Sequence, residues 1–288
     1  MAKKPEVSQA ETSTAQAAPK LSPGQVLNQA EYDELPFKEP TKRYLILSSQ
    51  RVGSKYLSSR LCNVKGMFGL PSEYLNSGSI DMMIPRLVAD ANKDSEGKPK
   101  IGLLKYMKAI QRARTTEDGY FGIKVQPHQL FAVTGKKKDR VLGFINSFDR
   151  VVLMTRQDKL GQAISGAIAQ ATGVWFNDEV ERELDDAQIT ALFPIIARNL
   201  SRYFEEEQFI LSVGKAISKP VLRVQYEDIE ANGDAAFATL VDFLAGSEGT
   251  QVEEDTTFAA VPEKPSSDLA DKIRLAFIDF ISGKKAAA

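Results

Sequence analysis

The sequence of 288 residues has one cysteine and one histidine. A single cysteine, Cys62, excludes an internal disulfide and a zinc cluster built on cysteines. A metal site made of several histidines is excluded in the same way, because His128 is the one histidine of the chain. We expect Cys62 to pack in the core, as small buried thiols do.

An excess of charge and a long apolar run are also missing. The formal net charge is −1, so no global basic field attracts the chain to nucleic acid or to an acidic membrane surface. Any anion site must therefore come from local geometry. No apolar run approaches the ~20 residues that a membrane span needs, and the first residues lack the apolar stretch of a secretory signal. We expect a cytoplasmic protein with no nucleic-acid partner and no integral membrane contact.

The composition divides the chain into two parts. Residues 1–42 are rich in Ala, Ser, Thr, Gln, Pro and Glu, which predicts a disordered leader. Residues 43–288 are expected to form a single domain, in which short apolar strands alternate with amphipathic helices. This alternation predicts an α/β fold of three layers, α/β/α, similar to the P-loop proteins, with a central and mostly parallel sheet. The predicted strands are 43–48, 119–125, 150–155 and 220–225, and the main helices are 158–175, 185–217 (kinked or restarted at Pro194), 233–245 and 267–282.

The stretch "RYLILSSQRVGSKYLSSRLC" (43–62) connects a buried strand to a helix through Gly, Ser and basic residues. Such a junction binds anions, because free backbone N–H groups and the positive end of the helix dipole face the ligand. The order Gly-Lys-[Ser/Thr] of the P-loop kinases is absent, since Gly53 is followed by Ser54, Lys55 and Tyr56. Without the hydroxyl that would ligate magnesium, the loop disfavours a kinase and predicts no metal requirement.

The loop residues 49–56, "SQRVGSKY", resemble the 5′-phosphosulfate-binding loop of sulfotransferases that use PAPS (3′-phosphoadenosine 5′-phosphosulfate). The resemblance is closest to the bacterial Stf-zero type, the trehalose 2-sulfotransferase group, which reads roughly "SQRSGSTL" here. Val52 and Lys55 depart from that pattern. Each replacement removes a hydroxyl, and Lys55 adds a cation.

Three further stretches resemble the same family, in the same order. "GLPSEYLN" (69–76) contains Glu73 where the family has its proposed general base. "FGIKVQPHQL" (121–130) resembles a family strand, in which Lys124 either covers apolar surface or faces the cleft. In "VLMTRQDKLGQAISGAIAQATGVW" (152–175), Arg156 and Ser165 take the places that hold the 3′-phosphate. "LRVQYEDIEAN" and a weaker echo at Glu263-Lys264 follow.

The resemblance implies an enzyme that moves the sulfuryl group from PAPS, its co-substrate, to a hydroxyl of a carbohydrate or glycolipid acceptor. The expected mechanism is in-line displacement, with Glu73 as base and with Arg51 and Lys55 stabilising the leaving phosphate. His128 is the competing base. The implied cofactor-binding residues are Ser49, Gln50, Arg51, Val52, Gly53, Ser54, Lys55, Arg156 and Ser165.

Two other functions remain open at this point: a P-loop nucleotide-dependent kinase, and a non-catalytic relative that binds a nucleotide. Val52 and Lys55 are the features that favour the latter. The acceptor could be a hydroxylated small molecule or a glycolipid, and the sequence leaves the oligomeric state open, a homodimer included. Trp175 is expected to pack rather than to stack on a ligand.

Overall fold

The computed structural model describes residues 33, 39–64, 67–88, 91–93, 95, 97, 99–175, 183–255, 261–262 and 268–284. Most of the predicted leader lies outside these residues, as does the Glu263-Lys264 pair, so the prediction of a disordered leader stays a prediction. Asp33, inside that leader, is placed: its carboxylate pairs with Arg86 and Arg114, each at 2.8 Å.

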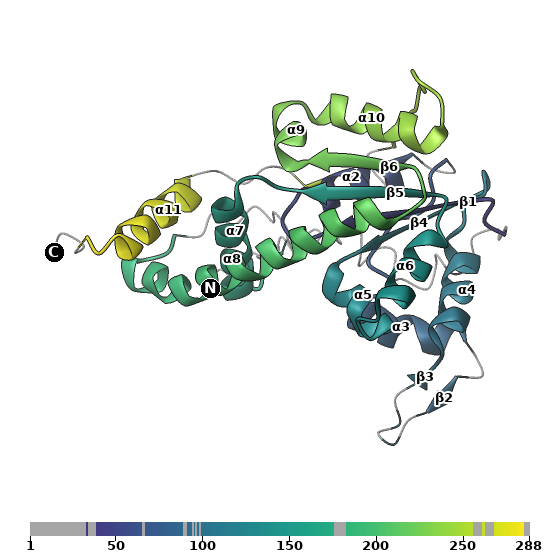
Figure 1. The fold of residues 1–288 in the computed structure, drawn as a ribbon, viewed down its shortest axis with the longest axis horizontal. Helices are drawn as coiled ribbons and strands as arrows, with labels where there is room; N and C mark the ends of the chain where they lie inside the picture. Colours follow the sequence, from purple (N-terminus) through teal and green to yellow (C-terminus); the bar gives the residue numbers. More distant parts are fainter. Residues whose placement is uncertain are drawn as a thin grey trace, which may run out of the picture.

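A four-stranded sheet forms the centre of the molecule (Figure 1). Its strands have the order β4-β1-β5-β6, and each neighbouring pair is parallel. In the register of the central strand β1, Leu45 lies between Ile123 of β4 and Val151 of β5. The predicted α/β class with a parallel sheet is therefore confirmed. The strands are β1 (Lys42–Ser48), β4 (Tyr120–Val125), β5 (Arg150–Thr155) and β6 (Val221–Gln225), within one residue of the predicted ranges.

Both faces of the sheet are buried, which explains why its strands are nearly continuous apolar runs. Leu45 and Leu47 of β1 belong to one hydrophobic cluster, while Tyr44 and Ile46 belong to another. The first cluster is completed by α3 (Ser77–Leu87), α4 (Leu103–Arg114), α5 (Pro127–Thr134), α6 (Lys138–Asn146) and the end of α8 (Asp186–Ala216). The second is completed by α2 (Ser54–Asn63) and α10 (Gly233–Ala245).

A third hydrophobic cluster lies beyond the end of the sheet, where α7 (Lys159–Thr172), the first half of α8 and α11 (Asp268–Ile281) pack together (Figure 1). Ile164, Phe193 and Phe277 represent the three helices in it. Of the two expectations for Pro194, the start of a new segment was wrong, because α8 runs through it. The kink stays a prediction. The short elements are β2 (Asn92–Lys93), β3 (Pro99–Lys100) and α9 (Tyr226–Ala231).

The carboxyl ends of all four strands lie along one edge of the sheet, since the strands are parallel. Ligands of open α/β sheets bind at this edge, at the point where the strand order reverses. In this sheet β1 lies between β4 on one side and β5 on the other, so the order reverses at β1. The loops after β1, β4 and β5 therefore converge at the carboxyl end of β1. Among the described residues, no helix has both the length and the apolar character to cross a membrane.

Candidate active site

The loop after β1 exposes the backbone N–H groups at the start of α2. Arg51 and Gly53 both have positive φ, 62° and 74°, and the chain turns sharply into the helix. No side chain caps α2 at its N-cap residue, Gly53. The positive φ favours glycine at this position, and an added Cβ would also lie 2.9 Å from Ile229 Cδ1, so that the end of this side chain would have to move. The loop therefore presents an uncapped helix N-terminus, the geometry that binds phosphate and sulfate groups.

Side chains from two other helices hold this loop in place. Gln162 of α7 donates from Nε2 to Ser49 Oγ at 2.9 Å and to the Gln50 carbonyl at 2.7 Å. Arg202 of α8 donates to Gln50 Oε1 at 2.9 Å. Because the loop is bonded from both helices, its conformation is organised before any ligand arrives, which reduces the ordering cost of binding.

The two predicted anion-binding junctions meet at Arg51. Its Nε donates to Ser165 Oγ at 2.9 Å, and its Nη1 donates to the Trp175 carbonyl at 3.0 Å. Burial lowers the pKa of the Arg51 guanidinium, and the positive charge of Arg156 acts in the same direction. Two cations held this close are stabilised by an anion between them.

Arg156 follows β5 and approaches the loop from the other side. Its Nη1 donates to the Arg51 carbonyl at 3.2 Å, and its guanidinium lies 4.0 Å from the centroid of the Tyr226 ring. Nη2 is 3.6 Å from Asp158 Oδ2. The buried Nε of Arg156 has no hydrogen-bond partner within the described part of the chain. This guanidinium therefore keeps hydrogen-bonding capacity beside the loop.

Glu73 lies at the end of β4, because the segment before it adds to the sheet. Lys124 of β4 donates its backbone N–H to the Ser72 carbonyl at 2.9 Å. Lys124 Nζ then pairs with Glu73 Oε1 at 2.8 Å, and Gln129 Nε2 donates to Oε2 at 2.7 Å. Burial raises the pKa of Glu73. The charge and hydrogen bond of Lys124, together with the hydrogen bonds of Gln129 and Gln126, outweigh burial and lower this pKa to about 2. Glu73 is a carboxylate at neutral pH, and the buried ammonium of Lys124 is its ion-pair partner.

His128 belongs to the first turn of α5, with 52% of its side chain exposed. Its Nδ1 is 4.0 Å from Glu206 Oε1. Burial lowers the pKa of His128, and the charge of Arg202 lowers it further, whereas Glu73 raises it. The imidazole is therefore mainly neutral at pH 7 and able to accept a proton.

The remaining loop residues have different roles. The Val52 side chain is fully buried in the second hydrophobic cluster, so this residue offers only its backbone to a ligand. Ser54 is buried at the first position of α2, and Lys55 follows it in the same turn. Trp175 is 39% exposed, and the expectation that it packs rather than stacks on a ligand stays a prediction. Cys62 is buried and unpaired, as expected for a core thiol.

Sequence reasoning did not find four residues that belong to the site: Gln162, Arg202, Glu206 and Tyr226. Gln162 precedes Ser165 by one helical turn, and this spacing on an amphipathic helix was a usable signal. Arg202 and Glu206 lie in a long helix with many charges, where local pattern does not separate a buried charge from a solvated one.

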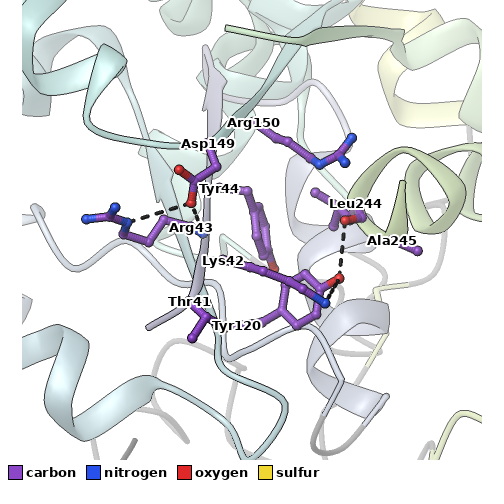
Figure 2. Close-up of a pocket in the computed structure, with 9 residues that line it drawn as sticks. All are labelled: Thr41, Lys42, Arg43, Tyr44, Tyr120, Asp149, Arg150, Leu244 and Ala245. Atoms are coloured by element: carbon purple, nitrogen blue, oxygen red, sulfur yellow. Dashed lines mark hydrogen bonds and ion pairs between the residues drawn. The ribbon is translucent and has the colours of Figure 1, made fainter. Parts of the chain in front are cut away.

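A cavity of about 180 Å³ lies away from this site, at the opposite edge of the sheet (Figure 2). It is formed where β1, β4 and β5 begin, next to the end of α10. Lys42 Nζ donates to Tyr120 Oη at 3.1 Å, and that hydroxyl donates to the Leu244 carbonyl at 3.3 Å. The backbone N–H of Arg43 donates to Asp149 at 2.7 Å. These hydrogen bonds connect the first residues of β1 and β4 with the end of α10 and with the residue before β5. Their role is structural.

No group of three or more His, Cys, Asp or Glu side chains is placed to hold a metal ion in the described ranges. The expectation of metal-independent chemistry stays a prediction.

The sequence profile of the Stf0 sulphotransferases matches residues 43–274. The chain therefore belongs to the Stf0 sulphotransferase family, and the protein is a sulfotransferase, as the resemblance predicted. No curated protein matches the chain.

Several solved structures are similar in fold. A sulfotransferase from Alicyclobacillus acidocaldarius is 13% identical, covering 87% of this chain and 98% of its own, with a TM-score of 0.46. The sulfotransferase domain from the curacin biosynthetic pathway is 14% identical, covering 87% and 94%, with a TM-score of 0.43. Retinol dehydratase, in complex with androsterone and the inactive cofactor PAP, is 14% identical, covering 90% and 84%, with a TM-score of 0.38.

Proposed function

We propose that the protein transfers the sulfuryl group of PAPS to a hydroxyl of a carbohydrate or glycolipid acceptor, without a metal. The observation that carries the proposal is the contact of Arg51 with Ser165, 2.9 Å from Nε to Oγ, beside Arg156. PAPS has two separate anionic groups, the 5′-phosphosulfate and the 3′-phosphate. The structure offers two strand-to-helix junctions, after β1 and after β5, joined by this contact.

The donor side of the proposed mechanism uses the loop after β1. The 5′-phosphosulfate would bind the N–H groups of Gly53, Ser54 and Lys55, and the 3′-phosphate would bind Arg156 and Ser165. Each charge-assisted hydrogen bond contributes roughly 1.5–3 kcal/mol, so several together are enough for micromolar affinity. In the transfer step the sulfur–oxygen bond to the 5′-phosphate breaks, and negative charge accumulates on that phosphate. Arg51, Lys55 and the helix dipole stabilise this charge.

The acceptor side uses Glu73 as the carboxylate general base. Lys124 and Gln129 fix both carboxylate oxygens, so the group is oriented and ionised before the acceptor binds. The acceptor hydroxyl attacks sulfur as its proton moves to Glu73, and a positioned base contributes roughly 10²–10⁴-fold in rate. The amides of Gln126 and Gln129 and the imidazole of His128 near Glu73 suit an acceptor with several hydroxyls, which is why a sugar is favoured.

Calorimetric titration with adenosine 3′,5′-bisphosphate, ADP and ATP, each with and without magnesium, tests the proposal. We expect metal-independent binding of the bisphosphate, tighter than ADP, and its loss in Arg156→Ala. The matched control is Lys137→Ala, an exposed cation at the start of α6. Binding of ATP with magnesium and indifference to the bisphosphate would support the nucleotide-dependent kinase instead.

Turnover separates an enzyme from a non-catalytic relative. Radiolabelled PAPS is supplied with candidate sugars and glycolipids, and transfer is compared in the wild type, Glu73→Gln and Lys137→Ala. Transfer that is lost in Glu73→Gln and kept in Lys137→Ala supports the proposal. Bisphosphate binding with no transfer to any acceptor would favour a non-catalytic nucleotide-binding relative.

A further inference from the structure

Glu206 is a buried carboxyl group that the mechanism above does not use. It lies on α8, where α8 packs against α5, and the residue is 8% exposed. Its Oε1 is 4.0 Å from His128 Nδ1, while its buried Oε2 has no hydrogen-bond partner among the residues that the structure describes. A buried carboxyl oxygen without a hydrogen bond is costly, and His128 is an ionisable group within ion-pair distance of this carboxyl group.

The charges around Glu206 keep it close to titration at neutral pH. Burial raises its pKa to about 7, Glu205 on the same helix acts in the same direction, and Arg202 opposes both. His128 faces it from α5 and is itself influenced by Arg202 and by Glu73. Two titratable groups that lie 4.0 Å apart influence each other's protonation and bind protons as a pair.

Glu73 needs such a pair nearby. With a pKa of about 2, its carboxylate accepts a proton from the acceptor hydroxyl in the transition state but holds it poorly afterwards. A proton transferred to Glu73 therefore moves on to a more basic group. His128 is placed for this role, because the next residue of α5, Gln129, donates to Glu73 Oε2 at 2.7 Å. The Glu73 charge also acts on the imidazole.

We propose that Glu206 is a positioning residue for His128, and that this pair takes the acceptor's proton from Glu73. The acceptor oxygen forms a bond to sulfur, the bond from sulfur to the 5′-phosphate oxygen breaks, and its electron pair stays on the phosphate. The acceptor proton passes to Glu73 and then to His128 Nε2, while the Nδ1–H of the imidazolium donates to the Glu206 carboxylate. This role rests on the proposed function, and the placement of the pair does not.

Arg202 connects this pair to the donor side. It precedes Glu206 by one turn of α8 and donates to Gln50 Oε1 in the loop after β1, at 2.9 Å. One helix therefore contacts both the loop that binds the donor and the imidazole that serves the acceptor. A shift of α8 that closes the 4.0 Å gap to His128 would also change the support of Gln50.

The presence of one histidine in the chain makes the test direct. The full-length protein, without a histidine tag, is labelled with ¹⁵N-histidine, and the ring nitrogens are followed by NMR against pH. We expect the wild-type His128 to be the Nδ1–H tautomer when neutral, so that Nδ1–H points to Glu206 and Nε2 is free to accept a proton. A neutral Nε2–H tautomer would overturn the proposal, even if no variant folds.

Three variants show whether Glu206 is responsible. Glu206→Gln is expected to lower the His128 pKa, because the imidazolium loses a carboxylate that can accept from its Nδ1–H. Glu206→Asp should restore part of the shift. Glu248→Gln, an exposed carboxylate beyond α10, should leave the titration unchanged. Equal titration curves in the wild type and in Glu206→Gln would refute the pairing.

The pH dependence of turnover tests the catalytic part. The acid limb of kcat for PAPS turnover is expected to follow the His128 titration and to move to lower pH in Glu206→Gln, with bisphosphate affinity unchanged. A role in folding alone would lower kcat without moving the limb, and that result would overturn the relay. Absence of turnover in the wild type contradicts the proposed function instead, and the NMR result stands separately.

Discussion

The guanidinium of Arg51 donates from Nε to the hydroxyl of Ser165 across 2.9 Å, although the two residues are 114 positions apart. This contact connects the loop after β1 with the helix after β5. It joins the two junctions that we propose to bind the two anionic groups of PAPS.

Loss of this contact should weaken nucleotide binding in a graded way. Arg51→Ala removes the charge and the support of the loop, and we expect bisphosphate affinity to fall by about 100-fold, the equivalent of one strong charge-assisted bond. Ser165→Ala removes a neutral hydroxyl and should weaken binding by about tenfold or less. Calorimetry measures both, with Lys137→Ala as the control. A larger effect in Ser165→Ala than in Arg51→Ala would contradict this assignment.

The ion pair of Glu73 with Lys124 should make stability depend on pH in the acid range. The folded-state pKa of Glu73 is about 2, below its ordinary value of 4.5. Its contribution is therefore complete above pH 4.5 and is lost as pH falls through 2. Glu73→Gln should destabilise the protein at about pH 6 and less so at about pH 3, as measured by urea denaturation. An equal destabilisation at both pH values would show that the carboxylate charge is not responsible.

Gly53→Ala should distort the anion loop by two separable effects. The residue has φ of 74°, and its added Cβ would lie 2.9 Å from Ile229 Cδ1. Gly135 also has positive φ, 67°, but has nothing within 4 Å of an added Cβ. Gly135→Ala should therefore show backbone strain alone, roughly 1–2 kcal/mol. Gly53→Ala should lose more stability, and bisphosphate affinity with it. Ile229→Val in the same chain should recover the part due to crowding.

Asp33 should stabilise the folded domain from within the segment predicted as a leader. Its carboxylate is 2.8 Å from Nη2 of Arg114, a side chain that is fully buried. Because Asp33→Asn removes an ionic partner from a buried guanidinium, we expect a loss of about 3 kcal/mol in the free energy of unfolding. Glu39→Gln is the control, since Glu39 pairs with Arg112 at 3.9 Å on the surface and should change little. Equal stability of Asp33→Asn and the wild type would contradict the role of this pair.

Pro194 shows where local pattern fails. A proline inside a helix removes one backbone hydrogen bond and costs about 3 kcal/mol, so a break at Pro194 was a reasonable expectation. In the structure α8 continues through it, with Phe193 and Ile196 on either side buried in the third cluster. Burial of large apolar side chains contributes about 1.5–3 kcal/mol each, enough to offset the missing bond.

The sequence by itself determined the features that depend on neighbours along the chain. The four strands are apolar runs bounded by polar residues, and the turn through Gly53 into α2 is encoded in consecutive residues. Only the tertiary structure decided which charges meet. Lys124 pairs with Glu73, Arg51 reaches Ser165, and Glu206 faces His128, because the order of the strands brings distant segments to one edge of the sheet. Ionisation depends on burial and on the charges within a few ångströms, and a local pattern in the sequence contains neither.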